Sequence, residues 1–156
     1  MKKALLLTIA MFLVAPALAA QNITYPKNLH EWQHLKSMVI NKGHPLFELL
    51  GGIHHIYASP KAMKGYKAGE FPDGAVIVLD LFESKELDNA IVEGAHKAVM
   101  VMEKSPKRFA QTGGWGFEVF DPDTKSGSLD AEAVHECFGC HSLQKNKDYV
   151  FSALRE

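Results

Sequence analysis

The stretch "PDGAVIVLDLFES", residues 72–84, decides the fold class of this chain of 156 residues. It begins with a Pro-Asp-Gly turn signal, after which apolar residues recur at every second position. Side chains alternate between the two faces of a strand, so one face would carry Ala75, Ile77, Leu79 and Leu81. Val76 and Val78 lie between them and are also apolar, so we expect a strand that is covered on both faces.

Three further segments predict other strands. "GGIHHIYASP", residues 51–60, is led by glycine, contains aromatic and β-branched residues, and is closed by a proline. "AHKAVMVMEKSPKRFA", residues 95–110, alternates in its first half, and we expect that strand to end before its proline. In "GGWGFEVFDPDT", residues 113–124, every second residue of the middle part is large and apolar, and a turn signal follows.

Helices are predicted around these strands. "YPKNLHEWQHLKSMVI", residues 25–40, has helical spacing of its apolar residues Leu29, Trp32, Leu35 and Met38. "KAMKGYKAGEF", residues 61–71, has a helical composition and should stop near Gly69, and residues 129–140 predict a third helix. The sequence therefore predicts an α+β fold, a mainly antiparallel β-sheet with flanking helices.

The first 19 residues have the pattern of a secretory signal peptide. Two lysines precede an apolar run, and the run is followed by the small-residue cleavage pattern Ala17-Leu18-Ala19. The run is too short for a spanning helix, which needs roughly 20 apolar residues. We therefore expect cleavage after Ala19, export to the periplasm, no membrane attachment after cleavage, and one mature domain over residues 20–156; an uncleaved anchor is the alternative.

The charge composition bears on the class of partner. The chain has 17 Lys and Arg against 18 Asp and Glu, a net charge of −1, and its basic residues are scattered. Nucleic-acid binding needs a concentrated basic surface, so this composition argues against nucleic acid as a partner.

The stretch "HECFGCHSL", residues 135–143, holds the only two cysteines of the chain, Cys137 and Cys140, with His141 directly after them. Cys-x-x-Cys-His is the attachment motif of haem c, in which each thiol forms a thioether and the histidine binds the iron. A zinc site would need about four ligands, and no second cysteine pair exists. A thioredoxin-like motif belongs early in a domain, whereas only 15 residues follow His141. We therefore predict one covalent haem c.

The chain resembles the cytochrome P-460 family, which includes the cytochromes c′-beta. The resemblance covers most of the predicted mature chain and is carried by "YPKNLHEW", "IYASPKAMKGYKAGEFPDGAVIVLDL", "KRFAQTGGWGFEVF" and "CFGCHSLQKNKDYVF". It implies a homodimer of mainly antiparallel β-sheet subunits, each with one haem near its C-terminus and an open distal side.

One position separates the two branches of the family. In cytochrome P-460 proper, a lysine in the strand after the Gly-Glu-Phe-x-Asp-Gly turn is cross-linked to the haem, and these enzymes oxidise hydroxylamine. The matching position here is Leu79, which has no nucleophilic nitrogen, and Asp80 should point to the opposite face. The sequence therefore resembles the cytochrome c′-beta branch, whose members bind NO and CO.

Candidate residues for the distal side of the haem follow from the same comparison. His54 falls near the position of a polar distal residue and is interpreted either as a hydrogen-bond donor to the ligand, as a sixth iron ligand, or as an exposed strand histidine. Apolar candidates for the pocket are Leu79, Leu81, Phe82 and Phe47, although core packing alone would also explain each of them.

Three functions remain open at this point. The first is a periplasmic protein that binds NO and CO, for scavenging or carriage of NO. The second is an oxidoreductase that acts on hydroxylamine or peroxide, against which Leu79 argues. The third is an electron-transfer cytochrome with a six-coordinate haem and a redox partner; no methionine occupies a family-matched axial position, although several methionines are available.

Overall fold

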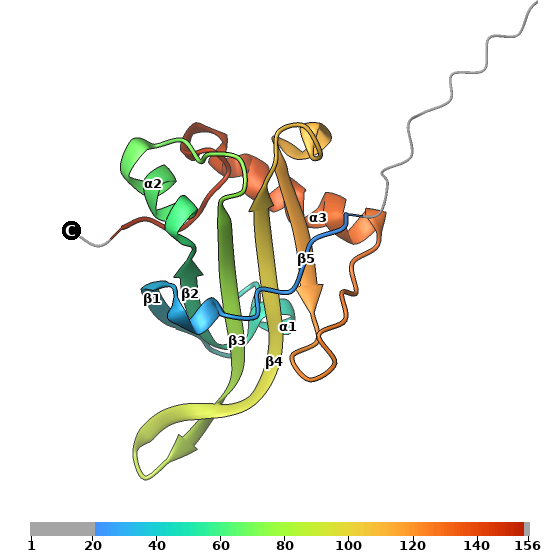
Figure 1. Cartoon of the computed structure of the whole chain (residues 1–156). Helices are drawn as coiled ribbons and strands as arrows, with labels where there is room; N and C mark the ends of the chain where they lie inside the picture. The colour runs from blue at the N-terminus through green and yellow to red at the C-terminus, as the bar shows by residue number, and fades with distance from the viewer. Residues whose placement is uncertain (1–20, 155–156) are drawn as a thin grey trace, which may run out of the picture.

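The computed structural model describes residues 21–154, so the predicted signal peptide lies outside the described residues. One antiparallel sheet of five strands runs in the order β1-β2-β3-β4-β5 (Figure 1). Its strands are β1 (Gln33–Ile40), β2 (Gly52–Ala58), β3 (Val76–Leu87), β4 (Ala90–Lys104) and β5 (Trp115–Phe120). The predicted α+β class is confirmed, as are the strands expected within residues 51–60, 72–84, 95–110 and 113–124.

Three α-helices flank the sheet: α1 (Phe47–Leu50), α2 (Pro60–Ala68) and α3 (Ala131–His141). Short 3-10 helices are η1 (Leu29–Glu31), η2 (Ala110–Thr112) and η3 (Ser142–Lys147). The Ser59 side chain caps the start of α2 by accepting from the Ala62 amide, and Gly69 ends it in the left-handed conformation. The helix expected to stop near Gly69 is therefore confirmed, as is the helix that carries the cysteines.

The prediction of a helix over residues 25–40 is wrong. Only the short η1 forms there, and the following residues make the edge strand β1, antiparallel to β2. The register shifts between His34 and Lys36, and Leu35 is buried at this irregularity. Strand pairing with β2 thus overrides the helical spacing of the apolar residues, and the β-branched pair Val39 and Ile40 suits a strand.

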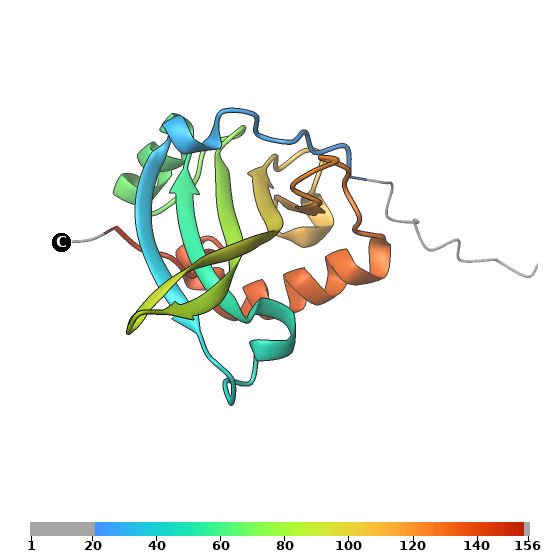
Figure 2. The ribbon, with the colours of Figure 1, turned by 90° about the horizontal axis from the view of Figure 1, so that it is seen from below.

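The sheet is covered on both faces, as the pattern of β3 predicts. One face of the sheet, here called the helix face, packs against α2 and α3 and includes Ile56, Ala58, Ile77, Leu79 and Phe117. The second, here called the N-terminal face, is covered by the chain before β1 and includes Leu29, Val78, Val99, Val101 and Phe120. Figure 2 shows the N-terminal segment and α3 on opposite sides of the curved sheet.

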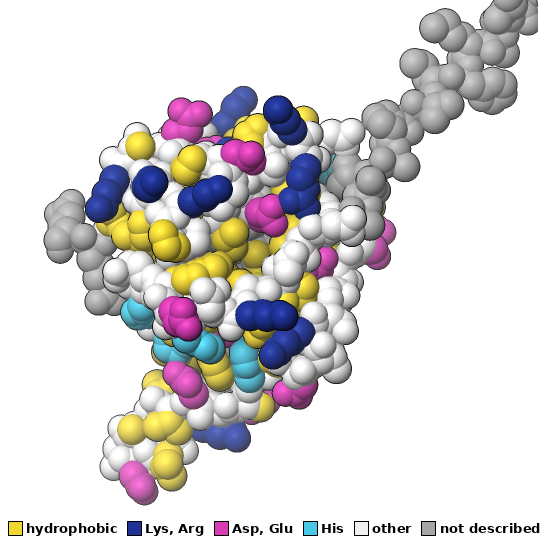
Figure 3. Space-filling view, in the orientation of Figure 1, with side chains coloured by type: hydrophobic (Ala, Val, Ile, Leu, Met, Phe, Trp, Pro, Cys, Tyr) yellow, Lys and Arg dark blue, Asp and Glu magenta, His cyan; other side chains and the backbone are white. Residues whose placement is uncertain are grey.

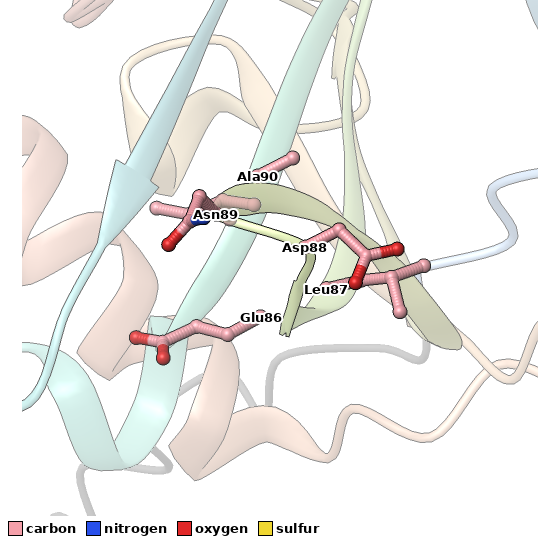
Figure 4. Close-up of a pocket in the computed structure, with 6 residues that line it drawn as sticks. Glu86, Leu87, Asp88, Asn89 and Ala90 are labelled. Atoms are coloured by element: carbon pink, nitrogen blue, oxygen red, sulfur yellow. The ribbon is translucent and has the colours of Figure 1, made fainter.

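Strands β3 and β4 continue as a two-stranded hairpin that projects from the body (Figure 1). Its turn residues, Asp88 and Asn89, have φ values of 49° and 63°, as a tight two-residue hairpin turn requires. Beneath the tip lies an open hollow of about 430 Å³ lined by residues 86–91 (Figure 4), and none of the predicted site residues lines it. No helix within residues 21–154 combines the length and apolar character needed to cross a membrane.

Candidate haem site

Helix α3 presents both cysteines. Asp130 precedes the helix and caps it by accepting from the Ala133 amide at 2.9 Å, and the buried Val134 packs the helix against the sheet. Cys137 and Cys140 are three residues apart, so their thiols project from one side of the helix about one turn apart. Both thiols are free, Cys137 half-buried and Cys140 exposed, and burial raises the pKa of Cys137.

His141 is the last residue of α3, and its surroundings fix its protonation. The Nδ1 atom lies 2.7 Å from the carbonyl oxygen of Tyr149, so Nδ1 carries the proton and donates it to that carbonyl. Burial lowers the pKa of His141, which favours the neutral ring. The rings of Phe117 and Phe151 lie 5.1 and 5.0 Å from the imidazole. Nε2 therefore keeps its lone pair, the state in which a histidine binds a metal.

Leu79 lies on the same side of the sheet as the cysteines. It packs against the core of the helix face, as do Cys137 and Phe138 of α3. Asp80 points to the N-terminal face, as alternation predicts, because its cross-strand neighbour Val99 belongs to the core of that face.

The family model of cytochrome P-460 matches residues 26–152, most of the chain. The chain belongs to the cytochrome P-460 family. This confirms the family predicted from the sequence, and it implies a haem cytochrome that binds haem and its iron. No curated protein matches the chain.

The residues around the cysteines fit the haem of a P-460 cytochrome. Two free thiols stand next to a neutral imidazole with an available nitrogen. Two large apolar residues that follow the motif in sequence are exposed, Leu143 with 76% and Phe151 with 52% of their surface, and the Phe151 ring contacts His141. A flat apolar macrocycle would cover such side chains, which would otherwise contact water.

His54 lies on the helix face but is enclosed. It faces Leu81 across the β2–β3 pair and is fully buried, so the interpretation as an exposed strand histidine is wrong. Its Nε2 donates to the carbonyl oxygen of Leu50 in α1, which leaves Nδ1 without a proton. Nδ1 is also buried, and it makes no hydrogen bond within the described part of the chain. In this arrangement His54 anchors α1 to β2 and cannot donate to a ligand.

The other pocket candidates are separated. Leu81 is buried on the helix face, across from His54. Phe82 instead stacks on His96 with ring centroids 4.4 Å apart, and it also contacts His55, which shows that it points to the N-terminal face. The placement of Phe82 in one pocket with Leu79 and Leu81 is therefore wrong, because side chains alternate along β3 and Phe82 shares the face of Asp80. Phe47 lies in α1, with its ring against Gly51.

Histidines gather on the N-terminal face beside acidic side chains, in the view of Figure 3. The fully buried Asp80 carboxylate lies 3.1 Å from His30 Nε2 and 2.6 Å from His96 Nε2. His55 pairs with Glu93 at 2.7 Å, and His54 and His55 point to opposite faces because side chains alternate along a strand. Within residues 21–154, no group of three or more His, Cys, Asp or Glu side chains is arranged to hold a bare metal ion.

Sequence reasoning missed the residues around His141. Tyr149, Phe151 and Phe117 each contact its ring or its Nδ1 atom. Tyr149 and Phe151 follow the predicted motif within a few residues, and that proximity was the available signal. Phe117 is 4% exposed, in the core of the helix face, and also contacts His141.

Proposed function

We propose that this protein is a periplasmic c-type cytochrome with one haem, whose distal side binds NO and CO and serves to scavenge or carry NO. In this proposal Cys137 and Cys140 form the two thioethers and His141 is the proximal iron ligand. When bound, the haem supplies an iron with one coordination position left for a small ligand.

The observation that carries the proposal is the contact between His141 Nδ1 and the Tyr149 carbonyl oxygen. Nδ1 donates its proton to the Tyr149 carbonyl, and burial lowers the pKa of His141, which favours the neutral ring. A metal-binding histidine commonly donates its second nitrogen in this way, which fixes the orientation of the ring. Together with the two free thiols on the same helix, this supports covalent attachment with His141 on the iron.

Leu79 supports ligand binding over hydroxylamine oxidation. It lies on the helix face with Cys137 and Phe138, and its side chain is inert. An aliphatic surface offers no hydrogen bond to a bound molecule, and it suits the uncharged diatomics NO and CO. Assignment to the cytochrome c′-beta branch rests on this residue.

Export and assembly belong to the same proposal. The pattern of residues 1–19 supports removal of a signal peptide and a periplasmic location, where covalent haem attachment is compatible with an oxidising compartment. The family resemblance supports a homodimer. Light scattering coupled to size exclusion gives the mass of the assembly, and N-terminal sequencing gives the cleavage site.

The proposal is tested with a matched pair of histidine variants on α3. His141→Ala should remove the proximal ligand and change the ferrous spectrum and the NO titration. His135→Ala, on the same helix but exposed to solvent, should leave both as in the wild type. If His141→Ala keeps the wild-type ferrous spectrum and NO affinity, then His141 is not the iron ligand.

A further inference from the structure

The carboxylate of Asp148 joins three parts of the chain behind the haem motif. Its Oδ1 accepts from Lys104 Nζ of β4 at 2.5 Å, and its Oδ2 accepts from the Phe71 amide at 2.9 Å. Its backbone carbonyl accepts from Trp115 Nε1 of β5 at 2.8 Å. These contacts tie the segment after η3 to the body of the protein.

Lys104 is a buried cation, with 6% of its surface exposed. Among the described residues, Asp148 is the only carboxylate that pairs with it. Lys104 also donates to the Gly113 carbonyl at 3.3 Å and lies over the Trp115 ring at 5.1 Å. Removing one partner of a buried ion pair leaves an uncompensated charge. The Lys104–Asp148 contact therefore holds both side chains in place.

The backbone after η3 adopts an unusual conformation. Asp148 and Tyr149 both lie in the left-handed region, with φ values of 48° and 65°. Two consecutive residues other than glycine in this region are rare, and a bulky tyrosine is disfavoured there. Such a conformation persists only where the surroundings impose it, and the contacts of Asp148 do so. The result is that the Tyr149 carbonyl points at Nδ1 of His141.

We propose that Asp148, through its ion pair with Lys104, is a positioning residue for the proximal histidine and tunes the bond between His141 and the iron. The inference rests on the proposed role of His141 as iron ligand. The Tyr149 carbonyl can accept the Nδ1 proton only while the left-handed pair is maintained, and this hydrogen bond raises the basicity of Nε2.

The consequence is a change in the ligand strength of His141. Without the Asp148 contacts, the left-handed pair relaxes and the carbonyl moves away from Nδ1. The imidazole then becomes a weaker donor, which favours the ferrous iron and raises the reduction potential. The iron–histidine stretching band of the ferrous protein should broaden and move to lower frequency.

The test uses Asp148→Asn and Asp148→Ala, with Glu103→Gln as the control. Glu103 is the neighbour of Lys104 on β4 and pairs with Arg108 at 2.5 Å, so its variant removes an ion pair without touching Asp148. Resonance Raman spectra and potentiometry should show both shifts in the Asp148 variants and neither in Glu103→Gln. If Asp148→Ala does not fold, Asp148→Asn alone decides.

Unchanged band position and potential in Asp148→Asn would overturn the inference. Shifts of equal size in Glu103→Gln would also overturn it, since they would reflect general loosening of β4. If the wild type has no iron–histidine band, the proposed function itself fails. The role of Asp148 is then read from ¹⁵N NMR of the His141 side chain: loss of the Nδ1-protonated tautomer in Asp148→Asn supports it, and retention contradicts it.

Discussion

His141 Nδ1 and the Tyr149 carbonyl oxygen are 2.7 Å apart, so backbone that follows the haem motif sets the position of the imidazole proton. A carbonyl only accepts hydrogen bonds, which places the proton on Nδ1 and leaves Nε2 with its lone pair. The segment after the motif is therefore part of the site.

Gly113 makes room for the Tyr149 ring, which predicts a large effect of a single methyl group. A Cβ at Gly113 would lie 2.5 Å from ring carbons of Tyr149, and φ there is +64°. Gly69 has φ of +83° with no atom within 4 Å of an added Cβ, so Gly69→Ala measures the backbone strain alone. We expect Gly69→Ala to cost about 1 kcal/mol of unfolding free energy and Gly113→Ala clearly more, in urea titrations. Equal losses would mean that the ring yields without cost.

The pair Cys137→Ser and Cys140→Ser should abolish covalent haem when combined, because each thioether needs a sulfur. Acid–acetone extraction should leave the haem on the wild type, remove it from the double variant, and remove part of it from either single variant. Extraction of all colour from the wild type would contradict covalent attachment.

Stability should fall in mild acid because of His54. Burial lowers its pKa below the unfolded value of about 6.5, so the unfolded chain takes up a proton that the folded protein excludes. The contribution is complete above about pH 6.5 and is lost as the pH falls toward the folded pKa. Urea unfolding at a series of pH values should show this decline. His54→Gln should have a shallower decline, whereas His135→Gln, exposed on α3, should keep the wild-type slope.

Leu79→Lys tests the assignment to a branch of the family. The variant places an amine on the helix face, where apolar surroundings favour its neutral, nucleophilic form. Under peroxide it should become cross-linked to the haem, as mass spectrometry of the haem peptide would show. The wild type should show no such peptide and negligible hydroxylamine oxidation. A cross-link already present in the wild type, for example through Lys61 or Lys64, would restore the enzyme interpretation.

The parts of the fold that sequence predicts are those with local signals. Apolar residues recur at every second position along residues 72–84. This pattern predicts β3 because the side chains of a strand point to its two faces in turn. Residues 25–40 mislead because their apolar residues have helical spacing, while pairing with β2 decides the structure.

In the candidate site, too, the residues predicted from the sequence are those with local signals. The Cys137, Cys140 and His141 motif is local in sequence and is read directly. The role of Asp148 is not, since it depends on Lys104 and Phe71, which lie 44 and 77 residues away. Phe82 was misplaced although the alternation along β3 gives its face: it lies two residues after Asp80 and therefore opposite Leu79 and Leu81.

The optical spectrum of the ferrous wild-type protein, before and after CO is added, shows whether the haem has His141 on one side and an open position on the other. We expect a high-spin ferrous spectrum of an unmodified c-type haem, converted to the CO form without displacement of a protein ligand. A low-spin ferrous spectrum that becomes high-spin in His54→Ala would contradict this expectation, because His54 would then be the sixth ligand.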